Sequence, residues 1–201
     1  MRLPRLIVVT DWGLPEASHW AALEAVAGLG PEVAIQHRDP GAPVRSFLER
    51  GRRLLSLCRA GGAQLCINGR LEVATVLGTH LHLPVDGPRP AEVRPFLAVD
   101  RWISAAVHSE QELLAASGAD CLLLSPVFAP GSKPGDLRPP LGLEGFRALA
   151  DRASIPAFAL GGMNADRARA LGPCAGVAAQ SAVLGARDPA AGARAILAAL
   201  Q

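Results

Sequence analysis

The chain has 201 residues, of which 50% are hydrophobic and 19% are charged, and 20 basic side chains nearly balance 18 acidic ones. This length fits one domain, and the composition excludes disordered, collagen-like and low-complexity proteins. A formal net charge of +2 does not indicate the basic surface that binds nucleic acid. With 4% aromatic residues and no Tyr, the chain also has few side chains on which bases could stack. We therefore expect no nucleic-acid partner.

Targeting and redox signals are weak. The N-terminal apolar run Leu6–Val9 is too short for a signal sequence, and no apolar stretch approaches the ~20 residues that span a bilayer. The cysteines lack metal-ligand spacing, and they are Cys58, Cys66, Cys121 and Cys174. We expect a cytoplasmic protein with reduced thiols and no membrane partner.

Strand-like and helix-like segments alternate along the whole chain. Apolar runs that predict strands cover residues 6–9, 33–35, 64–67, 80–83, 102–107, 121–127, 157–160 and 176–183. The segments between them are rich in Ala, Leu, Arg and Glu at helical spacing, as in Trp20-Leu23-Ala27 and Ala191-Ala195-Ala198. Continuous apolar strands are typical of a parallel sheet covered by helices. Eight such units predict an α/β (β/α)₈ TIM barrel, as a single compact domain over residues 1–201.

In such barrels the active site lies at the C-terminal ends of the strands. Polar side chains gather at the predicted ends, and they include Gln36, Arg38, Asn68, His82, His108 and Gln180. Turn and capping chemistry explains Asn, Asp and Ser at strand ends, but it explains Gln36, Arg38 and Gln180 poorly. The pattern therefore favours a functional site at the C-terminal ends of the strands.

A phosphate site is predicted after the seventh and eighth strands. Gly161 and Gly162 follow an apolar strand and precede Asn164, a predicted helix N-cap. Glycines let backbone N–H groups approach an anion closely, and Gln180 with Ser181 follows the next strand. Loops at these two places form the usual phosphate site of a barrel.

The ordered motifs resemble the thiamine phosphate synthase superfamily, which includes TenI-like proteins. The matching stretches are residues 6–11, 36–38, 67–70, 73–74, 81–83, 107–109, 118–120, 125–128, 132–134, 142–143, 161–163 and 181–182. The resemblance implies a (β/α)₈ barrel that acts on phosphorylated thiazole or pyrimidine in thiamine biosynthesis. Residues that match the family's binding pattern are Gln36, Arg38, Asn68, Ser132, Lys133, Gly162 and Ser181.

Other positions depart from the synthase pattern, which joins a pyrimidine diphosphate to a thiazole phosphate with Mg²⁺. The lysine position after strand two holds Pro40, and the aspartate beside Asn68 is replaced by Gly69. Asp86 lies about one residue away from the next acidic position, and Ala106 replaces a serine. These departures resemble the TenI-like branch, which keeps the phosphate-binding end and loses the metal end.

One activity of that branch is a proton shift that makes a thiazole carboxylate phosphate aromatic, and it needs an acid/base group but no metal. The histidine that serves there corresponds to Pro126 here. His82 and His108 are the remaining candidates, as proton shuttles with near-neutral pKa values. Lys133, the single lysine of the chain, lies in a Gly/Pro-rich loop and is expected to contact the phosphate and assist catalysis.

Our main interpretation is a metal-independent thiazole tautomerase-type enzyme with no cofactor and a phosphorylated small-molecule substrate. One alternative is the synthase itself, which would use Mg²⁺. Another is a non-catalytic barrel that binds a thiamine precursor or regulates through it. The sequence leaves a homodimer open as an assembly.

Overall fold

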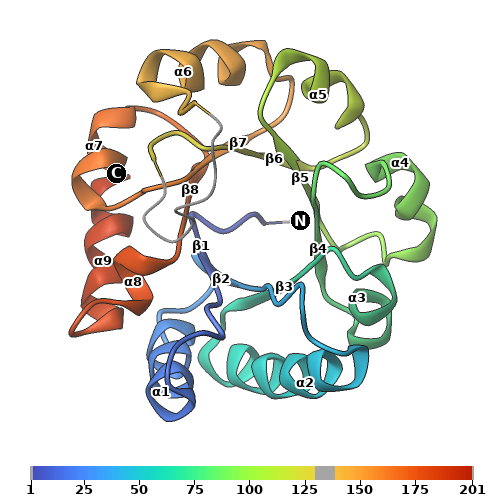
Figure 1. Cartoon of the computed structure of the whole chain (residues 1–201), viewed down its shortest axis with the longest axis vertical. Helices are drawn as coiled ribbons and strands as arrows, with labels where there is room; N and C mark the ends of the chain where they lie inside the picture. Colours follow the sequence, from blue (N-terminus) through green and yellow to red (C-terminus); the bar gives the residue numbers. More distant parts are fainter. Residues whose placement is uncertain (1, 130–138, 201) are drawn as a thin grey trace.

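The computed structural model of the chain describes residues 2–129 and 139–200. Eight parallel strands follow one another in chain order and close into a barrel inside a ring of helices (Figure 1). The strands are β1 (Leu6–Val9), β2 (Val33–His37), β3 (Gln64–Asn68), β4 (His80–Leu83), β5 (Ile103–Val107), β6 (Cys121–Leu124), β7 (Ala157–Leu160) and β8 (Gly176–Ala179). This closed arrangement confirms the predicted (β/α)₈ barrel.

The helices follow the strands and cover their outer faces. They are α1 (Glu16–Ala27), α2 (Val44–Gly61), α3 (Leu71–Leu77), α4 (Pro90–Val93) with the 3₁₀ turn η1 (Arg94–Phe96), α5 (Glu110–Ala115), α6 (Gly142–Arg152), α7 (Ala165–Leu171), α8 (Ser181–Leu184) and α9 (Pro189–Ala199). Within the described ranges, no helix combines the length and the apolarity needed to cross a bilayer.

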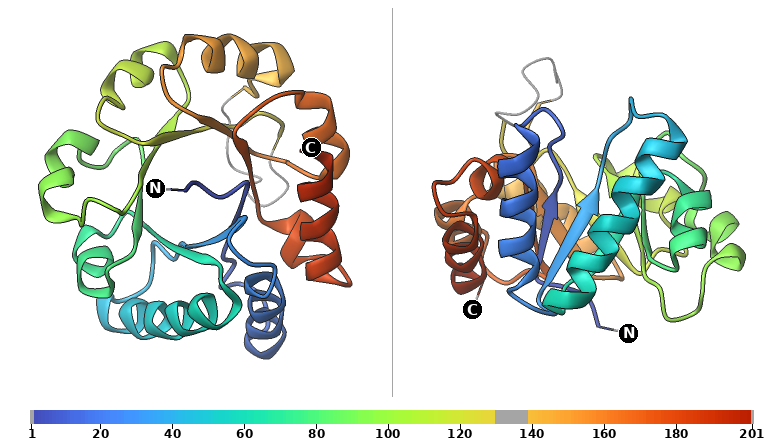
Figure 2. Two further views of the ribbon diagram at one scale, coloured as in Figure 1. Left: turned by 180° about the vertical axis from the view of Figure 1, so that it is seen from behind. Right: turned by 90° about the horizontal axis from the view of Figure 1, so that it is seen from below.

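The barrel closes where β1 meets β8. Leu6 pairs with Val33 of β2 on one side and with Val177 of β8 on the other. In Figure 2 both chain ends lie at the lower end of the right-hand view. The N-terminal segment approaches the interior at that end, where Leu3 packs against the inner core. This leaves the opposite end, at the C-terminal ends of the strands, for the site.

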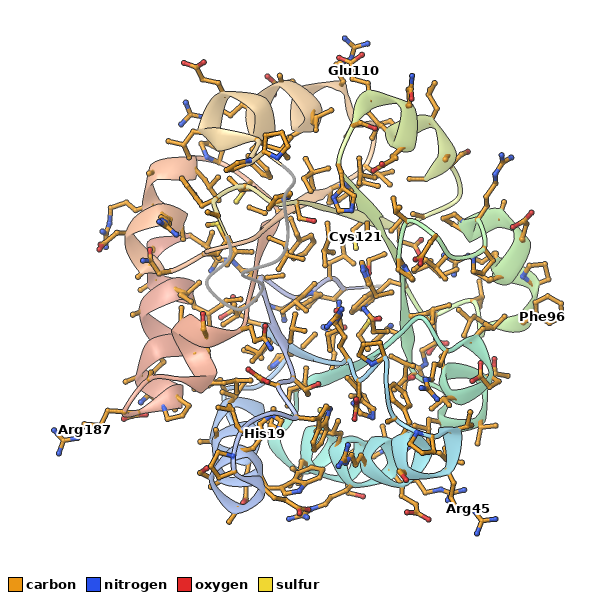
Figure 3. All side chains as sticks on the ribbon, viewed as in Figure 1. His19, Arg45, Phe96, Glu110, Cys121 and Arg187 are labelled. Carbon is orange, nitrogen blue, oxygen red and sulfur yellow. The ribbon has the colours of Figure 1, made fainter. Side chains whose placement is uncertain are left out.

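Side chains alternate between the inside of the barrel and the helices, as the pleat of a strand requires. Leu6 and Val8 belong to the core beneath the helices, whereas Ile7 belongs to the inner core. Figure 3 shows Cys121 within the ring of strands, while Arg45 points outward. The inner core contains Ile7, Ala34, Cys66, Trp102, Cys121, Leu123, Phe158 and Ala178.

Some predicted strand ends were wrong. β6 ends three residues before the predicted limit at Val127, because Pro126 has no N–H to donate to a neighbouring strand. β8 ends four residues before Val183, because the carbonyl oxygen of Gln180 accepts the N–H groups of Val183 and Leu184 and starts α8. Both corrections place polar residues at the barrel mouth rather than within a strand.

Candidate functional site

A cavity of about 540 Å³ opens at the C-terminal ends of the strands. It is lined by nine of the residues predicted from sequence, namely Gln36, Arg38, Asn68, His82, His108, Gly161, Gly162, Gln180 and Ser181. Ser132 and Lys133, the other two predicted residues, lie outside the described residues. The barrel therefore brings together side chains and turns from strands that are distant in the sequence.

Strand alternation explains why these residues meet. Ala34 faces the inner core, and Gln36 and Arg38 lie two and four residues further along on the same face. The same step of two leads from Cys66 to Asn68 on β3 and from Ala178 to Gln180 after β8. The cavity is thus the upper continuation of the inner core, with polar residues replacing apolar ones.

Amide groups of β2 and β3 form one wall of the cavity. Asn68 donates from Nδ2 to Oε1 of Gln36 at 3.1 Å, and Gln36 is only 2% exposed. The Nε2 atom of Gln36 has no hydrogen-bond partner within the described part of the chain. Because buried amide donors are nearly always paired in folded proteins, this atom suits a ligand that carries an acceptor.

His82 lies deep in the cavity and is 4% exposed. Its Nδ1 atom is hydrogen-bonded to the hydroxyl of Ser104 at 2.9 Å. Burial lowers the pKa of His82 to about 3, and the nearby charges of Arg38 and His108 add to this effect. The expected near-neutral pKa was therefore wrong for His82, whose ring is neutral at physiological pH.

His108 lies beyond the end of β5 and bonds to the end of β6. Its Nδ1 atom donates to the carbonyl oxygen of Ser125, and the hydroxyl of Ser125 lies 3.2 Å from the same nitrogen. This bond fixes the proton of a neutral ring on Nδ1, so Nε2 is the atom able to accept a proton. Sequence reasoning did not select Ser125, although it lies on the inward face two residues after Leu123.

The glycine pair after β7 forms a tight turn with positive φ values of 103° at Gly161 and 60° at Gly162. A Cβ at Gly161 would lie 2.9 Å from the Cα atom of Pro126, so the turn also packs closely on the segment after β6. Asn164 caps α7 as predicted, with its side chain accepting the N–H of Arg167 at 2.9 Å. The turn is thus fixed by its close packing on the segment after β6 and by the capped start of α7 that follows it.

The end of β8 contributes Gln180 and Ser181. Ser181 begins α8, and Gln180 donates from Nε2 to the carbonyl oxygen of Thr10 at 3.3 Å. The amide nitrogen of Gln180 is therefore tied to the end of β1 rather than presented to a phosphate.

Charge in the cavity is mostly positive. Arg38 and Arg70 are its basic lining residues, and Asp86 is the acidic one among the described residues that line it. Arg70, which we did not select from sequence, donates to the carbonyl oxygen of Ala42 at 2.5 Å. In the described ranges no three His, Cys, Asp or Glu side chains are grouped as metal ligands. This composition favours an anionic ligand.

Known proteins share this fold and much of this sequence. Residues 6–183 match the family model for thiamine monophosphate synthase. A thiamine-phosphate synthase of Chloroflexus aurantiacus is 37% identical over 198 residues, which cover 94% of this chain and 89% of the relative. One from Moorella thermoacetica is 39% identical over 180 residues, covering 86% and 85%.

A solved structure agrees with these relatives. The thiamine phosphate pyrophosphorylase of Pyrococcus furiosus superposes with a TM-score of 0.82 and 32% identity, covering 98% of this chain and 95% of its own. The resemblance that the sequence motifs indicated is confirmed by these similarities. The chain belongs to the thiamine monophosphate synthase family.

Proposed function

We propose that the protein is a thiamine-phosphate synthase, which joins a pyrimidine diphosphate to a thiazole phosphate and releases pyrophosphate. Relatives with that name, at 37% and 39% identity, support this alternative better than our main sequence-based interpretation of a tautomerase. In the reaction, a carbon–oxygen bond to the diphosphate breaks and a carbon–nitrogen bond to the thiazole forms. The leaving pyrophosphate needs its negative charge stabilised.

We assign the diphosphate to the wall formed by β2 and β3. Arg38 supplies a cation there, and the Nε2 atom of Gln36 supplies a buried donor. The amide of Asn68 bonds to Gln36 and fixes its orientation. Charge-assisted hydrogen bonds to phosphate are among the strongest in proteins, so this wall is suited to holding a leaving group whose charge increases.

We assign the thiazole phosphate to the opposite side of the cavity. The turn at Gly161 and Gly162 and the start of α8 at Ser181 line that side. Backbone N–H groups in a glycine turn can approach phosphate oxygens because no Cβ stands between them. Lys133, outside the described residues, remains a sequence-based candidate for the same phosphate.

A magnesium ion fits this cavity only together with the diphosphate. Mg²⁺ is usually held through one or two carboxylates plus substrate phosphates, and it keeps several waters. Asp86 and the amide oxygen of Asn68 are the protein oxygens that would hold it, since the nitrogen of Asn68 is committed to Gln36. When bound, the ion would stabilise the charge of the leaving pyrophosphate.

The observation that carries the proposal is the single cavity lined both by this wall of amides and a cation and by the glycine turn, in a chain with synthase relatives. The test is to incubate the protein with pyrimidine diphosphate, thiazole phosphate and Mg²⁺, and to measure thiamine phosphate by chromatography. We expect product that depends on all three components. Tight binding of both substrates without product would instead support a non-catalytic, precursor-binding barrel.

A thiazole tautomerase remains the second candidate, and a specific observation favours it. His108 is bonded to Ser125 so that Nε2 can accept a proton, and it lines the cavity beside His82. In addition, Gly69 stands in the place of a family aspartate, so the site has one carboxylate fewer with which to bind Mg²⁺. Proton exchange at the thiazole carboxylate phosphate, followed by NMR in D₂O without Mg²⁺, tests this candidate. Replacement of His108 by Gln should then abolish the exchange, whereas it should leave synthase turnover within about tenfold.

A further inference from the structure

Strand β1 is followed directly by a threonine that is nearly buried and is not among the residues that line the cavity. Thr10 is 2% exposed, and its hydroxyl makes two hydrogen bonds to the backbone of Arg38. The Oγ1 atom accepts from the N–H of Arg38 at 2.9 Å and donates to its carbonyl oxygen at 3.1 Å. The side chain of Thr10 therefore satisfies both backbone polar groups of Arg38, whose guanidinium group supplies a positive charge to the cavity.

These bonds extend the pairing of β1 with β2 beyond its regular end. The last paired residues are Val9 and Gln36, and the backbone N–H of Thr10 then donates to the carbonyl oxygen of Gln36 at 3.0 Å. Past that point the hydroxyl of Thr10 takes the place of the strand backbone. The segment at Arg38 is thus held by a side chain rather than by a further strand residue.

The seam between β8 and β1 is extended in the same manner. Its last pair is Val8 with Ala179, and Gln180 then donates from its side chain to the carbonyl oxygen of Thr10 at 3.3 Å. Thr10 consequently lies between the end of β8, which leads to Ser181, and the end of β2, which carries Arg38. It connects the two walls of the cavity without touching its interior.

We propose that Thr10 is a positioning residue that holds Arg38 against the diphosphate of the substrate. The proposal rests on the proposed function, because it assigns the diphosphate to the wall that contains Arg38. Removing the hydroxyl leaves two backbone groups of Arg38 without their partners, so the segment can shift. A charge-assisted contact to an anion depends on the placement of the cation, and small displacements reduce it strongly.

The test compares Thr10→Val with Thr10→Ser by calorimetric titration with pyrophosphate in the presence of Mg²⁺, and separately with thiazole phosphate. Valine keeps the shape of threonine but lacks its hydroxyl, whereas serine keeps the hydroxyl. We expect Thr10→Val to bind pyrophosphate about tenfold more weakly, and Thr10→Ser to stay within about twofold of the wild type. Thiazole phosphate affinity should change by less than about twofold in both, since Arg38 lies on the other wall.

A double-mutant cycle with Arg38→Gln separates the possible failures. If Thr10 acts through Arg38, the double variant binds pyrophosphate as weakly as Arg38→Gln alone. Unchanged binding by Arg38→Gln would mean that the diphosphate lies elsewhere, and the proposed site would fall with the inference. Weak binding by Arg38→Gln together with wild-type binding by Thr10→Val would overturn the role of Thr10 alone.

Loss of affinity for both ligands would also count against the inference, because a general loosening of the barrel acts on both walls. Thr10→Ala is a second variant that removes the same bonds without adding bulk. Circular dichroism establishes that each variant is folded before titration. If neither Thr10→Val nor Thr10→Ala folds, Thr10 is required for the fold itself and its assignment as a positioning residue is wrong.

Discussion

The imidazole of His82, which lines the cavity, and the hydroxyl of Ser104 lie 2.9 Å apart on neighbouring strands. Their register places them directly opposite each other in the pairing of β4 with β5. Both side chains are nearly or fully excluded from solvent, at 4% for His82 and 0% for Ser104. The bond therefore satisfies a buried polar pair at the point where the inner core becomes polar.

Replacing Ser104 by Ala should lower the free energy of unfolding by about 1–3 kcal/mol, because the Nδ1 atom of His82 loses its partner in a buried position. Urea unfolding at pH 7.5, followed by circular dichroism, measures the change. Ser56→Ala is a suitable control, since Ser56 is exposed on α2 and its loss should cost less than about 0.5 kcal/mol. Equal stabilities for the two variants would contradict the importance of the pair.

Stability should fall as the pH is lowered from about 6.5. Burial lowers the pKa of His37 to about 4 and those of His80 and His82 to about 3, from an ordinary value of 6.5. Below pH 6.5 the unfolded chain therefore binds protons that the folded protein does not, so the stability present above that pH is lost toward pH 4. Each such histidine contributes up to about 1.4 kcal/mol per pH unit.

Urea unfolding at several pH values between 7.5 and 5.0 checks this expectation. The slope between pH 6 and 5 should correspond to uptake of several protons on unfolding, whereas stability between pH 7.0 and 7.5 should be nearly constant. In His80→Gln the slope should decrease by about one proton. A flat profile down to pH 5 would mean that these histidines titrate normally in the folded protein.

Gly162→Ala should damage the turn after β7. The residue has a φ of 60°, and an added Cβ would lie 2.6 Å from the Nη1 atom of Arg167 and 2.9 Å from the carbonyl oxygen of Ala129. We expect a loss of about 1–3 kcal/mol in unfolding free energy, and thiazole phosphate binding at least about tenfold weaker. Gly41→Ala is the matched control, because a Cβ at Gly41 meets no atom of residues 2–129 and 139–200 within 4 Å. A Gly162→Ala protein as stable and as tight-binding as the wild type would remove this turn from the proposed phosphate site.

The barrel was predictable because parallel strands covered on both faces are continuous apolar runs, which the sequence displays eight times. The buried face of α9 was not predictable from the sequence. Ala191, Ala195 and Ala198 have the expected spacing but are exposed, while Ile196 and Leu197 are buried. A helix composed largely of alanine has small apolar residues on every side, so spacing alone does not indicate which side faces the strands.

Site residues were predictable where strand alternation is clear. Gln36 and Arg38 lie on the inward face, whereas His37 points outward, stacks on Phe47 at 3.8 Å and takes no part in the cavity. The properties of His82 were not predictable, because they depend on its burial and on Ser104 across a neighbouring strand. Pairings such as His108 with Ser125 likewise depend on register, which no local pattern specifies.

Gly69→Asp should increase magnesium affinity. Gly69 has a φ of 72°, and among the described residues its Cβ position meets only the ring carbons of Pro84 at 3.7 Å, so there is room for a side chain. Among residues with a side chain, Asp and Asn adopt this left-handed conformation most readily, at a cost of roughly 1 kcal/mol. The new carboxylate would join Asp86 in the cavity lining and provide the two carboxylates that Mg²⁺ commonly uses.

Calorimetric titration with Mg²⁺ in the absence of substrate measures the gain. The wild-type protein should show no micromolar binding, because Asp86 is its one acidic lining residue among those described. Gly69→Asp should bind Mg²⁺ at least about tenfold more tightly, while Gly69→Asn, with the same backbone requirement and no charge, should resemble the wild type. If Gly69→Asp gains no affinity, residue 69 does not lie where the ion binds, and the loss of a family aspartate there cannot account for weak metal binding. Micromolar binding by the wild type would show that Asp86 and its neighbours already form a metal site before the diphosphate arrives.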